Sequence, residues 1–303
     1  MAIDRRLGHL KLQDLRVLTL AAEAGSMAKA AAALGISQPS VSYAIANLER
    51  VLGVPLFDRG PQGVSVTDYG RALIERGTVA LNEMQYAVNA IGTLADPRQG
   101  QVRLGTTPPM SAIASQVIAR LTRRHPRMTF HLMNDNTTAL LRLLRQREIE
   151  IAISRIVPPF DEPDIADQKL FEDQLAVIAS RSSPWLSRPR IKLADLTAER
   201  WVLPPETAFL GSLIHQIFRV HGIEPPRPTV TTTSTYATAL MVANGPFLTI
   251  QPATMLKASQ RYGLLAALPV DLKAARHPVA LLALKDRALS AAAQLFLKVA
   301  REG

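Results

Sequence analysis

The side chains best placed to do chemistry in this sequence are hydrogen-bonding groups on one face of a short helix predicted to begin near residue 38. That face carries Pro39, Tyr43, Asn47 and Arg50, flanked by Ser40 and Ser42. The opposite stripe carries Val41, Ile45, Leu48 and Leu52, so we expect it to face a core. A helix whose outer face is small and polar can enter the major groove of DNA, where base edges offer donors and acceptors. The predicted chemistry is recognition of a duplex.

The elements around this face fit a helix-turn-helix. A first predicted helix ends near Gly25, and a short alanine-rich helix follows from Met27 to Leu34. Gly35 ends that helix, and Ser37 is positioned to cap the polar one, where Pro39 removes an N–H that has no intrahelical partner. Alanines allow two helices to approach closely, as a helix-turn-helix requires.

Residues 54–66 (VPLFDRGPQGVSV) are predicted to form two short strands around a glycine- and proline-rich turn. Such a hairpin beside the recognition helix would be a wing. Arg59 on the wing could reach a phosphate or the minor groove.

A long helix is predicted from Thr67. Apolar residues recur on it at alternating spacings of three and four, which is a heptad seam. The seam runs through Ile74, Gly77, Leu81, Met84, Val88 and Ile91. The expected dimerisation residues are Ile74, Leu81, Met84, Val88 and Ile91. Packing on its own domain is the alternative, but we expect the same helix of a second copy, because polar residues occupy the rest of the helix. Such a dimer would match a two-fold DNA site.

After a predicted hinge at residues 95–101, the pattern changes to alternating strands and helices. Strands are expected at 102–106, 128–133, 149–154, 175–179, 201–203, 230–233, 247–250 and 279–284. Helices are expected at 111–124, 138–146, 212–220, 236–243 and 289–299. This alternation predicts parallel-type sheets covered by helices on both faces, with ligands bound beyond the carboxyl ends of strands.

Composition excludes several classes of protein. The 303 residues are 48% hydrophobic and 20% charged, ordinary for a folded chain of two or three domains. There is no cysteine, and the six histidines never recur at the i, i+4 spacing that lets two imidazoles share a metal. GxSxG, GxxxxGK[ST], HExxH and GxGxxG motifs are absent. We therefore expect no catalytic residue, no metal site and no cofactor.

The net charge of +10 does not by itself indicate a nucleic-acid partner, because residues 1–94 carry only +1 and residues 95–303 carry +9. No apolar run approaches the roughly 18 residues of a membrane span. The first residues, MAIDRRLGHL, lack the apolar stretch of an export signal. We expect a cytoplasmic protein without a membrane partner.

The N-terminal residues resemble the LysR-type transcriptional regulators. The stretch AAEAGSMAKAAAALGISQPSVSYAIANLERVLGVPLFDR, followed by GVSVTDYGRAL, is similar to that family's winged helix-turn-helix almost without gaps. The segment EIEIAISR and the later strand-helix alternation suit the family's periplasmic-binding-protein-like effector domain. The resemblance covers essentially the whole chain. It implies a homodimer or homotetramer, often a dimer of dimers, that binds promoter DNA and responds to a small molecule held between two subdomains.

Together, the resemblance and the polar helix face assign the DNA contacts. Gln38 suits base recognition, because its amide can pair with adenine through two hydrogen bonds. Tyr43 departs from the Arg, Lys or Gln often found at that position, which puts the target sequence in doubt. Ser37 could also act as a helix cap, and Arg50 is equally explained as a solvated residue. The expected DNA-binding residues are Ser37, Gln38, Pro39, Ser40, Ser42, Tyr43, Asn47 and Arg59.

The effector site is expected where the first strand of the second half ends. Hydroxyls and free backbone N–H groups at that turn would suit a carboxylate or another anion, although Pro108 and Pro109 depart from the family there. The resemblance implies that residues after a strand of the second subdomain face the same cleft. Helix capping is the alternative for each hydroxyl, and an exposed salt bridge for Arg155. The expected effector-binding residues are Thr106, Thr107, Ser111, Asn136, Arg155, Pro204, Thr207 and Phe209.

The predicted organisation is a winged helix-turn-helix at 10–67 with its motif at 27–46, a linker helix at 68–94, the hinge, and an effector domain at 102–303. Within that domain we expect subdomain I at 102–174 and 271–303 and subdomain II at 175–270. The expected function is a transcriptional regulator whose effector closes the cleft between the subdomains and changes how the tetramer spaces its DNA-binding dimers. A solute-binding component and an enzyme are the alternatives. The missing export signal and the attached helix-turn-helix oppose the first, and the missing catalytic motifs oppose the second.

Overall fold

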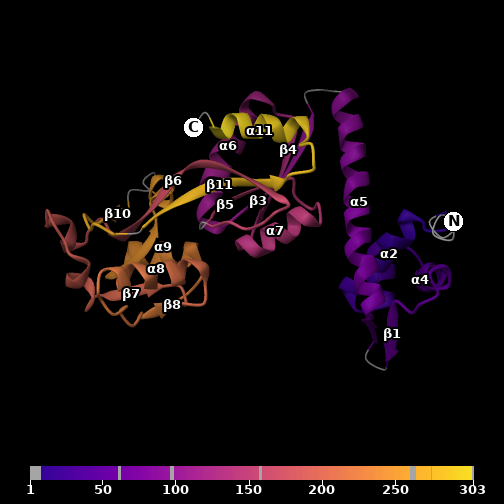
Figure 1. Cartoon of the computed structure of the whole chain (residues 1–303), viewed down its shortest axis with the longest axis horizontal. Coiled ribbons are helices and arrows are strands. Elements are labelled where there is room, and N and C mark those ends of the chain that lie inside the picture. The colour runs from indigo at the N-terminus through magenta and orange to yellow at the C-terminus, as the bar shows by residue number, and fades with distance from the viewer. Residues whose placement is uncertain are drawn as a thin grey trace. The chain divides into compact units, whose positions relative to one another are not determined.

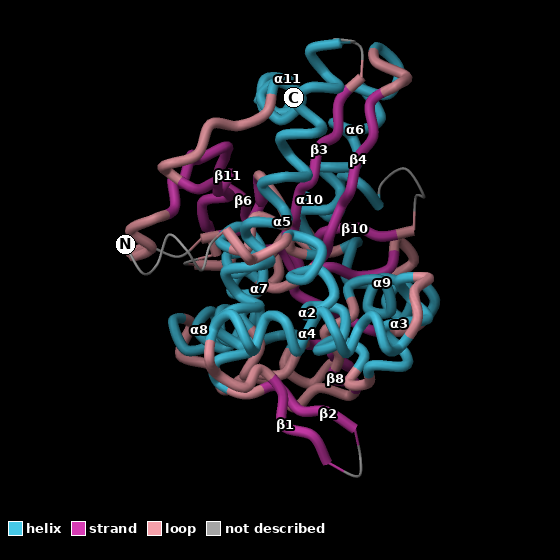
Figure 2. Tube along the Cα trace, turned by 90° about the vertical axis from the view of Figure 1, so that its right-hand side faces the viewer, coloured by secondary structure: helices cyan, strands magenta, loops and turns pink. Residues whose placement is uncertain are grey.

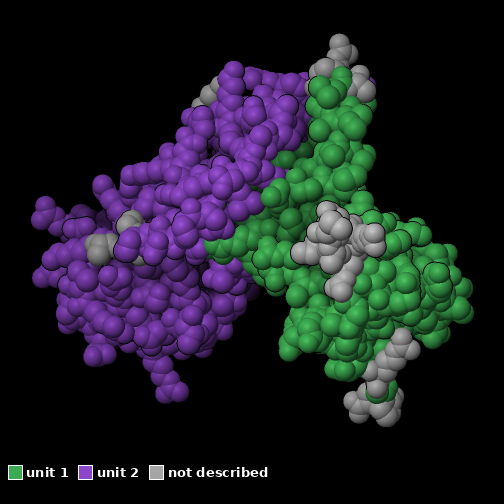
Figure 3. Space-filling view, turned by 45° about the vertical axis from the view of Figure 1, so that its right-hand side comes forward, with its two compact units in different colours: residues 1–101, 141–150 green, residues 102–140, 151–303 purple. Residues whose placement is uncertain are grey.

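The computed structural model describes residues 8–60, 63–95, 99–156, 159–259, 264–273 and 275–301. The chain divides into two compact units (Figure 3). One contains residues 1–101 and 141–150, and the other contains residues 102–140 and 151–303.

Three short helices build the core of the first unit. They are α2 (Leu12–Ala24), α3 (Met27–Leu34) and α4 (Gln38–Leu52). Each is followed by a glycine with positive φ, namely Gly25, Gly35 and Gly53, a conformation that suits glycine because it has no Cβ. Leu18 and Ile45 are fully buried between the helices. The predicted helix-turn-helix is therefore present as α3 and α4.

A two-stranded hairpin follows α4. Its strands, β1 (Phe57–Gly60) and β2 (Gly63–Val66), pair antiparallel with Phe57 opposite Val66. Figure 2 shows the hairpin projecting beyond α2 and α4. This is the predicted wing.

The long helix α5 (Asp68–Ala95) divides into a covered part and an uncovered part. Near its start, Ile74 packs on the core of the helix-turn-helix, and Leu15 of α2 approaches Gly77. The expectation that this seam has no local partner is wrong here, because α2 presents an apolar side chain to it. Further along, Met84, Val88, Ile91 and Leu94 are 50%, 59%, 68% and 83% exposed.

A mixed sheet forms the second unit, in the order β4-β3-β5-β11-β6-β9-β7-β8, with β10 also paired to β6. The strands are β3 (Gly100–Thr106), β4 (Met128–Asn134), β5 (Ile151–Arg155), β6 (Ile165–Ser180), β7 (Arg200–Leu203), β8 (Val230–Thr231), β9 (Phe247–Pro252), β10 (Leu265–Ala267) and β11 (Arg276–Leu284).

The expectation of parallel-type sheets holds at the ends of this order and fails in the middle. β3 pairs parallel with β5, and β7 pairs parallel with both β8 and β9. In between, β11 runs antiparallel to β5 and β6, and β6 runs antiparallel to β9. β6 is also much longer than the predicted 175–179, because its polar, exposed first half around Asp167 gives no apolar signal.

The helices that connect and follow these strands are η1 (Pro108–Met110), α6 (Ser111–Arg124), α7 (Thr137–Arg145), η2 (Pro184–Ser187), η3 (Leu193–Leu196), α8 (Phe209–Val220), α9 (Thr235–Asn244), α10 (Ala253–Ser259) and α11 (Ala291–Arg301). Residues 141–145 of α7 belong to the first unit. α6 and α11 pack together against one side of the sheet (Figure 1). β10 and α10 were not predicted from the sequence, and they are only three and seven residues long.

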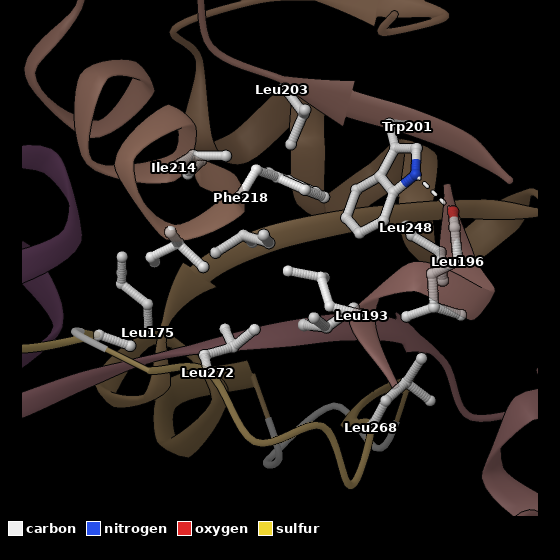
Figure 4. Close-up of a cluster of buried hydrophobic side chains, with 14 of the residues drawn as sticks. Leu175, Leu193, Leu196, Trp201, Leu203, Ile214, Phe218, Leu248, Leu268 and Leu272 are labelled. Carbon is white, nitrogen blue, oxygen red and sulfur yellow. Dashed lines mark hydrogen bonds between the residues drawn. The ribbon is translucent and has the colours of Figure 1, made fainter. Parts of the chain in front are cut away.

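Two large hydrophobic cores and a smaller cluster of Ile178, Val242, Leu256 and Leu265 lie along the described part of the sheet. One gathers side chains of β3, β5, β11, α6 and α11 around Phe296. The other surrounds Trp201, whose ring meets Phe218 edge-on at 5.9 Å and whose Nε1 donates to the carbonyl of Leu196 (Figure 4). β6 supplies residues to both cores, Phe171 to the first and Leu175 to the second.

Candidate DNA interface and ligand cavity

The start of α4 is held by two serines. Ser37 Oγ accepts a hydrogen bond from the backbone N–H of Ser40 at 3.3 Å, so Ser37 caps the helix. The hydroxyls of Ser37 and Ser40 also lie 2.8 Å apart. Both serines therefore order the first turn, whatever else they contact.

The outer face of α4 is open to solvent. Gln38, Pro39 and Ser40 are exposed, and Tyr43 is 76% exposed. Ser42 is half-buried. Large aromatic side chains are on average well buried in folded proteins, so the exposed ring of Tyr43 is available to a partner. The side chains predicted to meet DNA thus share one accessible surface.

Asn47 is already occupied within the domain. Its Nδ2 donates to Asp14 Oδ2 on α2 at 3.2 Å, and its Oδ1 accepts from Arg50 Nη2 at 2.8 Å. The bond to Asp14 ties α4 to α2, and the bond from Arg50 lies within α4. An amide bonded on both sides has less capacity left for a base edge than the amide of Gln38.

Side chains of Glu49 in α4 and of Thr67, just before α5, hold the chain at the base of the wing. These contacts were not predicted from the sequence. Glu49 Oε1 accepts from the backbone N–H groups of Leu56 and Phe57, at 2.8 and 3.3 Å. Thr67 Oγ1 donates to the carbonyl of Pro55 at 2.8 Å. Arg59 lies in β1 opposite Val64, and its side chain falls outside the described part of the structure.

The second unit contains a cavity of about 900 Å³. It lies where β3, β5, β7 and β9 end and where several helices begin. Six of the expected effector residues line it, namely Thr107, Asn136, Arg155, Pro204, Thr207 and Phe209. Its volume is in the range of sites for small organic ligands.

Thr106 and Ser111 are not among the lining residues and instead form a hydrogen-bonded cluster with Asn134. Ser111 Oγ and Thr106 Oγ1 donate to Asn134 Oδ1 at 2.6 and 2.8 Å. Thr106 is fully buried. The cluster joins the ends of β3 and β4 to the start of α6, so its role in this structure is to hold the wall of the cavity.

Arg155 reaches the cavity from a buried ion pair, not from the exposed salt bridge considered as an alternative. Its Nη2 lies 2.7 Å from Asp173 Oδ2, and Asp173 also accepts from Thr254 Oγ1 at 2.9 Å. Burial lowers the pKa of Arg155, while Asp173 acts to raise it. A guanidinium keeps its charge in proteins, so Arg155 brings a compensated positive charge to the wall.

Three helices of eight or more residues begin at the cavity. Lining residues include Thr137 and Thr138 at the start of α7, Phe209 at the start of α8, and Thr235 at the start of α9. The first N–H groups of a helix lack intrahelical partners and carry partial positive charge, which favours an anion.

Several further lining residues were not predicted from the sequence. They are Thr232 and Thr233, which follow β8, Thr235 and Thr238 of α9, and Gln251 of β9. The available signal was the hydroxyl-rich run TVTTTSTYAT at 229–238.

A winged helix-turn-helix combined with an α/β unit that contains a ligand-sized cavity defines a DNA-binding regulator. Residues 12–71 match the family described as bacterial regulatory helix-turn-helix protein, lysR family, and residues 95–303 match the LysR substrate binding domain. The chain belongs to the LysR family. It is a LysR-type transcriptional regulator with an effector-binding domain and not an enzyme, which confirms the interpretation based on the resemblance.

Individual relatives agree with this assignment. The HTH-type transcriptional regulator GbpR of Azospirillum brasilense is 29% identical over 295 residues, which cover 97% of this chain and 86% of GbpR. Full-length CbnR complexed with its target DNA is similar in fold, with a TM-score of 0.73, 22% identity and coverage of 97% and 99%. The effector binding domain of QuiR in complex with shikimate gives a TM-score of 0.55 at 22% identity, covering 67% of this chain and 96% of that domain.

Among the described residues, no helix has the length and apolar character needed to cross a membrane.

Proposed function

We propose that the chain binds promoter DNA through the outer face of α4 and the wing. The observation that carries this proposal is the open surface formed by Gln38, Pro39, Ser40 and Tyr43 on a helix whose other face is buried. CbnR, a family member of the same fold, is described in complex with its target DNA. Ser37, Ser42, Asn47 and Arg59 complete the proposed contacts, with Asn47 contributing mainly through the packing of α4 on α2.

The chain acts as a homodimer or homotetramer in this proposal. The uncovered apolar residues of α5, from Met84 to Leu94, support pairing with a second copy. Leu81 is half-buried at the boundary of this surface, whereas Ile74 belongs to the chain's own core. Because its proposed partner is promoter DNA on the chromosome, we propose that the protein is cytoplasmic.

The cavity of the second unit is the proposed effector site, and its ligand is anionic. Three helix starts and the guanidinium of Arg155 support an anion, and the hydroxyls of the lining threonines supply further donors. Thr107, Asn136, Pro204, Thr207 and Phe209 are proposed contacts. Thr106 and Ser111 act behind the wall through Asn134.

Ligand binding closes the cavity between subdomain I (102–174 and 271–303) and subdomain II (175–270). The two large hydrophobic cores support the boundary after residue 174, because Phe171 of β6 packs in the first core and Leu175 in the second. Leu272 and Ala275 pack in the second core, so the return to subdomain I lies after residue 275 rather than at 271. A ligand can shift the equilibrium only by binding the two arrangements with different affinity. Closure thereby changes the spacing of the DNA-binding dimers.

Selection of duplexes from a random-sequence DNA pool by the purified full-length chain tests this function. We expect enrichment of a two-fold symmetric site and a loss of about 1–3 kcal/mol in specific binding for Gln38→Ala. Thr107→Val should keep the DNA affinity and lose the response to ligand. Failure to enrich any sequence, or undiminished affinity of Gln38→Ala, would contradict the proposed recognition surface.

A further inference from the structure

Two polar side chains on one strand have buried atoms that lack a hydrogen-bond partner. They are Thr249 and Gln251 of β9, which are 2% and 6% exposed. The unpartnered atoms are Thr249 Oγ1 and Gln251 Oε1. The two residues are separated by one position, so both side chains lie on the same face of the strand. Unpaired polar atoms are costly to bury and are uncommon in native cores, which makes two on one face notable.

Both residues line a second, smaller chamber next to the ligand cavity. Thr235, Thr238 and Gln251 line the chamber and the cavity alike, so the two spaces adjoin. The remaining walls are apolar and include Ile178, Val242 and Leu256. The chamber has a volume of about 10 Å³. That is about the space of one water-sized group, too small for a ring or a branched chain.

The chemistry of the two atoms narrows the ligand groups that fit. Gln251 Oε1 can only accept a hydrogen bond, so the group must donate one. Thr249 Oγ1 can donate or accept, and a hydroxyl can also do both. An ammonium group is disfavoured, because its full charge would be surrounded by an uncharged amide and apolar walls. A methyl group would fit by size but leave both protein atoms unpaired.

We propose that Thr249 and Gln251 form an inner subsite that selects effectors carrying a hydroxyl group. The effector is therefore a hydroxylated carboxylate, with its anionic end at the helix starts and its hydroxyl in the chamber beside β9. This inference rests on the proposed function of the cavity. The hydroxyl donates to Gln251 Oε1 and accepts from Thr249, and the Oγ1 of Thr238 is already engaged with the carbonyl of Ser234 at 3.0 Å.

Calorimetric titration of the full-length chain with matched pairs of small carboxylates tests the subsite. The probes are pairs that differ by one hydroxyl, such as 3-hydroxybutanoate with butanoate and lactate with propanoate, together with larger pairs of the same kind. We expect at least one hydroxylated member to bind about tenfold or more tightly than its partner, because a site that hydrogen-bonds a hydroxyl rejects the analogue without it. Gln251→Met and Thr249→Val should reduce that preference, and Gln294→Met on the far helix α11 should not.

The outcomes separate the subsite from the cavity. Carboxylate binding that is equal within every pair, or a hydroxyl preference that survives both substitutions, overturns the subsite and leaves the anionic-ligand function standing. If no carboxylate binds the unsubstituted chain, the subsite and the anionic-ligand function are both contradicted.

A measurement without ligand adds an independent check: Thr249→Val should raise the melting temperature, because it removes an unpaired buried hydroxyl at nearly constant volume. A lowered melting temperature would show that the hydroxyl is bonded within the protein and would overturn the role of Thr249.

Discussion

Arg155 Nη2 and Asp173 Oδ2 lie 2.7 Å apart, and the pair joins β5 to β6 across β11, which runs between them. Both side chains are almost completely buried. Thr254, just after β9, donates to the same carboxylate. One ion pair thus connects strands of both hydrophobic cores directly behind the ligand cavity, where a change in their relative position would alter its geometry.

Removing one partner of this pair should be strongly destabilising. Arg155→Leu leaves the carboxylate of Asp173 buried without its counter-charge, and we expect a loss of about 3–5 kcal/mol in the free energy of unfolding. The double variant Arg155→Leu/Asp173→Leu should lose less than Arg155→Leu alone. Urea unfolding measures both. Lys169→Ala is the control, because Lys169 pairs with Glu172 at the surface and such pairs contribute about 1 kcal/mol or less. Equal losses for Arg155→Leu and the control would contradict this assignment.

The stability of the second unit should fall in mild acid because of His277. Burial lowers the pKa of His277, Arg155 lowers it further, and Glu172 and Asp173 act in the opposite direction. Below about pH 6.5 the unfolded chain takes up a proton at this position more readily than the folded chain does, so folding stability decreases as the pH falls. His277→Gln should lose less stability than the unsubstituted chain between pH 7 and pH 5. Superimposable pH profiles of the melting temperature would refute the effect.

Gly211 should be required for the effector response. A Cβ at this position would lie 1.9 Å from the carbonyl oxygen of Pro205, so Gly211→Ala must displace the loop that carries Pro204 and Thr207. We expect operator binding to persist and the ligand-induced change to disappear, as measured by fluorescence anisotropy of labelled operator DNA. Ser212→Ala, at the exposed next position, is the matched control. A full ligand response in Gly211→Ala would show that this loop does not shape the site.

The uncovered surface of α5 should govern assembly. Ile91→Glu places a charge in the proposed helix pair and should shift the chain to monomer in light-scattering measurements, with a corresponding loss of operator affinity. Ala90→Glu places the same charge at another exposed position of α5 and should leave the assembly intact. A dimer or tetramer that survives Ile91→Glu would mean that other surfaces hold the copies together.

Local signals predicted most of the architecture. The serine caps and glycine stops around α3 and α4 are encoded within a few residues of the turn they form, so sequence alone located the helix-turn-helix. The packing of Ile74 on the core of the helix-turn-helix and the ion pair of Arg155 with Asp173 depend on contacts between distant segments, which periodicity does not reveal. Gln251 was missed because the apolar run predicted a strand ending at residue 250, whereas β9 continues to Pro252.

Recognition of the operator by α4 is tested most directly by a footprint of the purified chain on the DNA immediately upstream of its own gene. We predict protection of an interrupted palindrome extending over several helical turns, as two dimers on one operator require. Gln38→Ala should lose that protection at the same protein concentration. Absence of protection at moderate salt, or equal protection by the unsubstituted chain and Gln38→Ala, would contradict the claim that α4 reads the operator of this regulator.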